Sequence, residues 1–188
     1  MIHKAASPRS KSIRIDKPAP VPASPLLEEQ RPAFPMLVRS REGRALSEAR
    51  YRNGESFALA IEELRFSDTG DLLYQTGIVT QMALSSHLLD VGFDDRWCAR
   101  NIGLHISTAL AYANATGLNY QSPELERLAT VLSPYNVWRN PDIHGSRPPV
   151  LASLPDIPLL LRELLDHVRG ITGHSRPSRL LKKSTAWR

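Results

Sequence analysis

The sequence predicts an all-α fold, a compact antiparallel bundle of four to five helices with disordered N- and C-terminal tails. Apolar residues recur at spacings of three and four through the middle of the chain, as in helices that bury one face. No stretch of useful length alternates apolar and polar residues as a half-buried strand would. The chain has 15 prolines but none from Met36 to Ser122, so this region can hold long helices.

Proline and charge divide the 188 residues into three parts. Seven prolines lie between Pro8 and Pro35, and they exclude a regular helix from the N-terminal segment. We therefore predict a disordered, proline-rich, basic tail over residues 1–42, a helical domain over 43–170, and a second basic tail over 171–188.

The net charge of +5 belongs to the ends of the chain. Residues 1–40 hold seven Lys or Arg against three Asp or Glu, and residues 171–188 hold five Lys or Arg and no acid. Residues 41–170 hold twelve Arg, no Lys and sixteen Asp or Glu. Because the attraction of a charge falls off over about 8–10 Å in salt, the tails, and not the acidic body, would hold a nucleic acid.

The first two predicted helices flank a polar turn. Gly54 is expected to break the first, which leaves a short helix over about residues 55–66. Asp71 is expected to cap the second, over residues 72–91. Gly92 suits the left-handed position that closes such a helix.

Three more helices begin at cap signals. Asp94 is a predicted N-cap for a helix over residues 95–116, which has the clearest apolar spacing in the chain. Ser122 and Pro123 predict a further start, because serine caps and proline suits the first helical position. The last helix is predicted over residues 156–170, after a long proline-containing loop.

The turn at Gly92 suggests a helix-turn-helix, whose second helix would enter the major groove of DNA. That motif needs a small residue where Leu88 stands and an apolar residue where Asn101 stands. Asp94 and Asp95, at the start of the second helix, would repel phosphates. An ordinary helical hairpin is the favoured interpretation.

The sequence predicts no metal site, no cofactor and no enzyme activity. The six histidines form no HExxH or ExxH pair, and one cysteine cannot build a multi-cysteine zinc site. A hairpin around Gly92 would bring His87 level with Cys98, which makes a nucleophilic Cys–His pair conceivable. Because Cys98 also shares an apolar row with Ile102 and Ile106, a buried, unreactive thiol is favoured.

The densest polar and aromatic patch lies in the predicted loop over residues 136–154. It holds Trp138, Arg139 and His144, our candidate contacts for a partner. Tryptophan and arginine are enriched where interfaces gain most of their binding energy. The alternative is that Trp138 folds back to cover the core.

The C-terminal segment is basic and contains no acid. Its cationic side chains are candidate contacts for nucleic acid: Arg176, Arg179, Lys182, Lys183 and Arg188. Such a segment could lie on phosphates, on an anionic membrane surface, or on the acidic body of the protein itself.

Two function classes follow. We expect a non-enzymatic helical interaction protein that binds another protein. The alternative is a nucleic-acid-associated accessory or regulatory protein that binds through its basic tails. No apolar run approaches the roughly 20 residues of a membrane helix. The lone cysteine and the lack of an apolar N-terminal segment favour the cytoplasm.

Overall fold

The computed structural model describes residues 35–63, 66 and 68–176. Within them the chain forms helices and no strand, which confirms the predicted all-α fold. The α-helices are α1 (Arg41–Glu63), α2 (Thr69–Val91), α3 (Asp95–Asn101), α4 (Ile106–Ala115), α5 (Pro123–Val131) and α6 (Ile157–Thr172). Two short 3-10 helices, η2 (Tyr135–Arg139) and η3 (Leu151–Ser153), lie between α5 and α6. None of the helices in the described ranges combines the length and apolarity needed to cross a bilayer.

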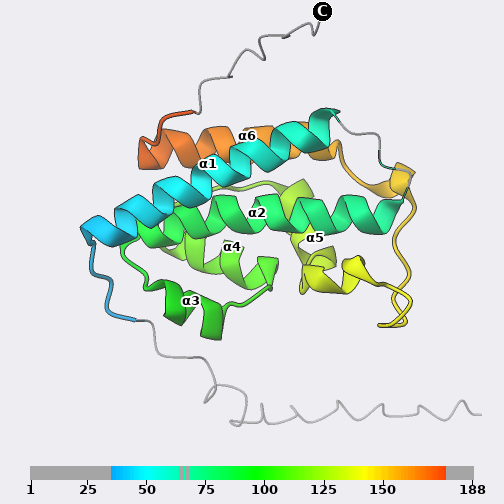
Figure 1. Cartoon of the computed structure of the whole chain (residues 1–188), viewed down its shortest axis with the longest axis horizontal. Coiled ribbons are helices and arrows are strands. Elements are labelled where there is room, and N and C mark those ends of the chain that lie inside the picture. The colour runs from blue at the N-terminus through cyan, green and yellow to red at the C-terminus, as the bar shows by residue number, and fades with distance from the viewer. Residues whose placement is uncertain (1–34, 64–65, 67, 177–188) are drawn as a thin grey trace, which may run out of the picture. The chain divides into compact units, whose positions relative to one another are not determined.

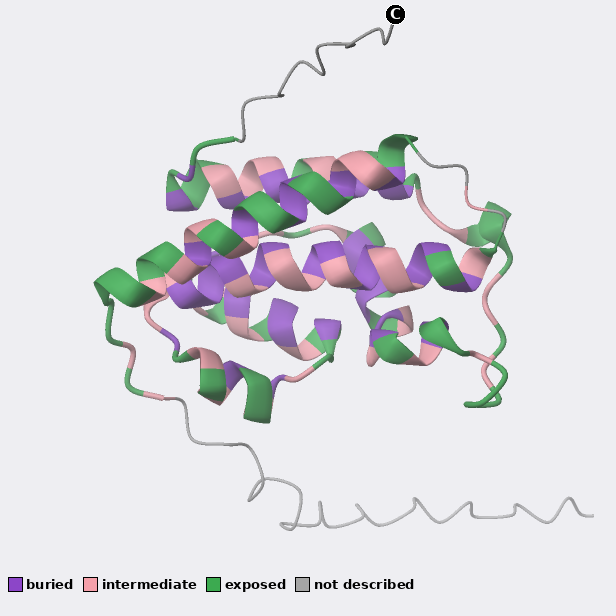
Figure 2. Ribbon diagram, in the orientation of Figure 1, coloured by how far each residue is buried: buried purple, intermediate pink, exposed green. Residues whose placement is uncertain are grey.

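α2 lies at the centre of this arrangement (Figure 1). It packs on α1 and α6 and also on α4 and η2, while α5 packs on α4. α1 and α2 form an antiparallel hairpin, and α6 runs opposite to α1 (Figure 1). Figure 2 shows buried residues along the whole length of α2. The hydroxyls of its two buried threonines near the middle are satisfied within the helix, since Thr76 and Thr80 donate to the carbonyls four residues earlier at 2.6 and 2.8 Å.

α1 continues through Gly54, so the prediction that this glycine breaks the first helix is wrong. Gly54 is buried where α1 meets α2 and α6. A Cβ atom there would lie 3.3 Å from Leu165 Cδ2 and 3.4 Å from Met82 Cβ. The glycine lets three helices approach closely, and their packing outweighs its cost of about 1 kcal/mol relative to alanine in a helix.

The predicted helix over residues 95–116 is in fact two helices, α3 and α4. Between them Gly103 has a left-handed φ of 57°, and its carbonyl accepts a 2.7 Å hydrogen bond from the Gln81 side chain of α2. Ile102 and Ile106 are buried on either side of the break. The apolar spacing that predicted one helix is therefore kept across a bend.

The predicted ends of the other helices depend on local hydrogen bonds. Two predicted N-caps, Asp94 and Ser122, are confirmed, since each accepts a bond from the backbone N–H three residues on. Asp156 caps α6 in the same way. Gly92 closes α2 with a left-handed φ of 111°, as predicted. Asp68, and not the predicted Asp71, caps α2. α6 continues past Gly170, and Gly173 closes it with a left-handed φ of 70°.

Candidate functional site

The structure separates the three predicted contact residues of the loop. Trp138 is 8% exposed, and its indole Nε1 donates a 2.9 Å hydrogen bond to the Val131 carbonyl. It thus covers the core, the alternative that the sequence left open. Arg139 and His144 are exposed, and Arg139 has no ion pair with any described residue.

η2 seats the start of this loop against α2. The Tyr135 side chain lies directly on Gly77, where a Cβ atom would be 2.3 Å from Tyr135 Cγ. The ring of Tyr74 lies beside Tyr135, with 6.0 Å between centroids. At the start of α2, a Cβ on Gly70 would lie 3.1 Å from the Trp138 carbonyl oxygen. These contacts with α2 fix the position of η2, from which the loop begins.

Beyond η2 the loop folds on itself and exposes apolar side chains. The N–H groups of His144 and Ser146 donate to the Pro141 carbonyl at 3.1 and 2.9 Å, which closes a turn. Three large apolar side chains lie exposed between η2 and α6: Ile143 (79%), Val150 (74%) and Leu151 (53%). Sequence reasoning missed them because they follow no helical or strand period. Their only signal was apolar character within a loop rich in proline.

A groove lies between α5 and the end of this loop, and we call it the α5 groove. Its volume is about 370 Å³. Most of the residues that line it are apolar: Leu128, Val131, Pro149, Leu154 and Pro155. A second hollow of about 570 Å³, which we call the acidic pocket, lies between the start of α5 and α6. It is lined by three carboxylates, Glu124, Glu163 and Asp166, and Glu124 also lines the α5 groove.

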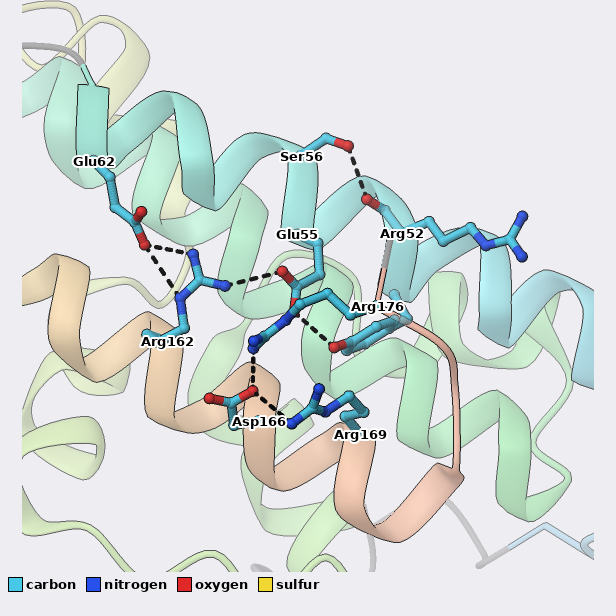
Figure 3. Close-up of polar contacts among 9 residues, drawn as sticks. Arg52, Glu55, Ser56, Glu62, Arg162, Asp166, Arg169 and Arg176 are labelled. Carbon is cyan, nitrogen blue, oxygen red and sulfur yellow. Dashed lines mark hydrogen bonds and ion pairs between the residues drawn. The ribbon is translucent and has the colours of Figure 1, made fainter. Parts of the chain in front are cut away.

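An ion-pair cluster joins α1, α6 and the chain that follows α6 (Figure 3). At its centre Glu55 is 2% exposed and accepts bonds from Arg162 Nη1 at 2.9 Å and Arg176 Nε at 3.4 Å. The Tyr51 hydroxyl donates to Glu55 at 2.6 Å, and burial, followed by this bond, raises the pKa of Tyr51. Arg176 also pairs with Asp166. Two cations compensate one buried carboxylate, so the cluster fastens the chain after α6 to the helical body.

A buried serine–histidine contact lies near the end of α6. Ser47 Oγ is 2.6 Å from His174 Nε2 and 2.6 Å from the Ser86 carbonyl oxygen. A carbonyl can only accept, so the Ser47 hydroxyl donates to Ser86, and His174 Nε2–H donates to Ser47. A general base would instead accept the serine proton. The direction of these bonds supports a structural contact and gives no activated nucleophile.

Burial and the nearby charges disfavour a nucleophilic Cys98–His87 pair. Burial, followed by the nearby Asp95 and Asp94, raises the pKa of Cys98 to about 12, so the thiol stays protonated at neutral pH. His87 is 1% exposed, and its Nε2 lies 3.3 Å from Thr116 Oγ1. Both side chains belong to the core.

The short α3 favours the ordinary hairpin over a helix-turn-helix. α3 has seven residues, begins at Asp95 and is capped by Asp94. A recognition helix presents its N-terminal residues to the groove, where these carboxylates would meet phosphates. Arg96 and Arg100 are exposed on the same helix.

Most of the predicted nucleic-acid contacts lie beyond the described part of the chain. Of the five, only Arg176 is described, and it pairs with Glu55 and Asp166. The remainder are Arg179, Lys182, Lys183 and Arg188. In the ranges that the structure describes, no three His, Cys, Asp or Glu side chains gather in a way that could hold a metal ion.

No protein-family model, curated protein or solved structure matches this chain, so its function has to be inferred from its own residues.

Proposed function

We propose that this protein is a non-enzymatic helical protein of the cytoplasm that binds another protein through the segment between η2 and α6. The observation that carries this proposal is the exposure of Ile143, Val150 and Leu151 on a segment whose base is anchored to the core. Exposed apolar patches mark binding surfaces on folded proteins, and these three side chains fall within one stretch of nine residues.

The anchoring matters because binding has an entropic cost. A loop that must be ordered on association loses part of the binding energy, whereas a pre-ordered loop keeps it. Here Trp138 and Tyr135 hold the base of the loop, and the Pro141 carbonyl closes its turn. The apolar side chains are therefore available to a partner without much reordering.

The charges of the segment indicate the chemistry of the partner. Arg139 and Arg147 are exposed, and neither has an ion pair with a described residue. Asp142 is the one acid between residues 139 and 155. An apolar surface with carboxylates at its rim would complement this segment, because rim charges steer and orient association.

Site-specific cross-linking in the full chain tests this proposal. A photo-crosslinking amino acid replaces Ile143, or as a matched control Phe57, which is 40% exposed on α1. We expect a protein to be cross-linked from position 143 and not from position 57. With that protein purified, Ile143→Asp should weaken binding by about 10- to 150-fold, the equivalent of the roughly 1.5–3 kcal/mol gained on burying such a side chain.

The control variant for the affinity measurement is Phe57→Asp, which should leave the dissociation constant unchanged. Identical cross-linked products from both positions would contradict the proposal. So would equal affinities of the purified partner for the wild-type chain and for Ile143→Asp.

A further inference from the structure

The α5 groove and the acidic pocket fit an occupant that the chain itself supplies. We propose that residues 177–188 dock across the acidic pocket into the α5 groove of the same molecule. The end of the segment between η2 and α6 lines part of the α5 groove, but Ile143, Val150 and Leu151 do not. This inference therefore does not depend on the proposed function, because it involves other side chains and a different ligand.

The first argument is where the described chain ends. Arg176 pairs with Asp166 (Figure 3). Asp166 also lines the acidic pocket. Glu55, which is 2% exposed, also holds Arg176. The buried cluster therefore fixes the chain at the edge of the acidic pocket, and the residues that follow start beside it.

The second argument is charge complementarity. Residues 177–188 contain four cationic side chains and no acid: Arg179, Lys182, Lys183 and Arg188. In the acidic pocket, Asp166 pairs with Arg169 and Arg176, and Glu124 with Arg127. Glu163 is exposed on α6 and has no ion pair with a described residue. It is the carboxylate open to a further cation.

The third argument is the order of residues along the segment. Leu180 and Leu181 stand four and five residues after Arg176, a reach of up to about 13–18 Å in an extended chain. Because Glu124 lines both hollows, the acidic pocket adjoins the apolar α5 groove. A segment with a cation first and two leucines next matches a surface that is acidic first and apolar next.

Hydrogen–deuterium exchange of the full chain, followed by mass spectrometry, tests the docking. In the wild type we expect the amides of residues 177–188 to exchange at least 10-fold more slowly than in an isolated peptide of this sequence. Glu163→Lys should remove this protection, and so should the double variant Leu180→Asp/Leu181→Asp. Exchange in α2 shows in the same data whether each variant is folded.

The matched control is Glu126→Lys, which makes the same charge change on the exposed surface of α5. Glu126 lies on the side of α5 that faces Ser107 and Ala111 of α4, away from both hollows. Glu126→Lys should leave the protection of residues 177–188 unchanged. Exchange at peptide rates in the wild type would overturn the proposal, as would protection that survives Glu163→Lys. Protection that rises with protein concentration would also overturn it, since the groove would then hold a second copy of the chain.

Discussion

Among the buried polar side chains, some have hydrogen bonds whose direction is fixed by their partners. Ser47 shows this most clearly, because it accepts from His174 and donates to Ser86. His87 is equally buried, although only its Nε2 has a partner, Thr116, among the described residues. Two neutral histidines in a core make the stability of the fold sensitive to pH, because burial penalises the charged form of the ring.

We predict that the free energy of unfolding decreases as the pH falls below about 6.5. Burial, first of all, lowers the pKa of both His87 and His174 from 6.5, and Arg44 adds to the effect at His174. Below 6.5 the unfolded chain binds protons that the folded chain resists, so each histidine costs up to about 1.4 kcal/mol per pH unit. Urea unfolding between about pH 7.5 and pH 5 measures this decrease.

The variant His174→Gln serves as the control. The glutamine amide can still donate to Ser47, but it does not titrate, so the unfolding free energy of this variant should depend less on pH. A wild-type free energy that stays constant across the range would contradict the prediction.

At the scale of the helices, glycines lie at the closest contacts. The effect of replacing one with alanine on stability depends on the group that faces it. Gly54 and Gly77 are buried in α1 and α2, where a neighbouring helix or ring occupies the space of a Cβ atom. Gly170 lies in α6, where a Cβ atom would meet no neighbouring group within 4 Å. The same substitution should therefore have opposite effects at Gly77 and Gly170.

Gly77→Ala should lower the unfolding free energy by about 1–3 kcal/mol, because the new methyl group collides with the Tyr135 ring. Gly170→Ala should raise it by about 0.5–1 kcal/mol, because alanine favours a helix and the site is open. Urea unfolding of both variants measures the difference. Tyr135→Ala, which removes Cγ and the rest of the ring, should relieve part of the loss in Gly77→Ala. A gain in stability for Gly77→Ala would show that the contact can relax.

At the scale of the whole molecule, α2 is the element on which most of the others pack. It packs on α1, α4, α6 and η2, and its buried residues belong to one continuous core. Trp97 lies in an aromatic cluster with Phe93 and Tyr112, whereas Trp138 lies at η2. These two tryptophans report on separate parts of the described chain.

Leu84→Ala should destabilise both parts together. Leu84 is 0% exposed in α2, and removing a buried leucine side chain costs about 2–5 kcal/mol. In a Trp187→Phe background, the fluorescence transitions of Trp97 and Trp138 in urea should shift to lower denaturant and stay coincident. Midpoints that separate for the two probes would show that α2 does not couple them.

Much of the fold could be predicted because it depends on residues close in the sequence. A cap such as Asp94 bonds to an N–H three residues away, and a helical face repeats every three or four residues. The break at Gly103 escaped prediction because Ile102 and Ile106 keep the helical spacing across it. For the candidate site, the loop was predicted but not the orientation of Trp138, which depends on a core formed by other helices.

The helical class, the starts of α3, α5 and α6, and the separation of basic ends from an acidic body can be read from the sequence alone, since each follows from composition or from neighbours within one turn. Only the tertiary structure decided that Gly54 lies inside a helix and that Ile143 is exposed. It also decided that Arg176 joins Glu55, 121 residues earlier in the chain. No local pattern encodes such a contact, because it forms only where packing brings distant segments together and buries the Glu55 carboxylate.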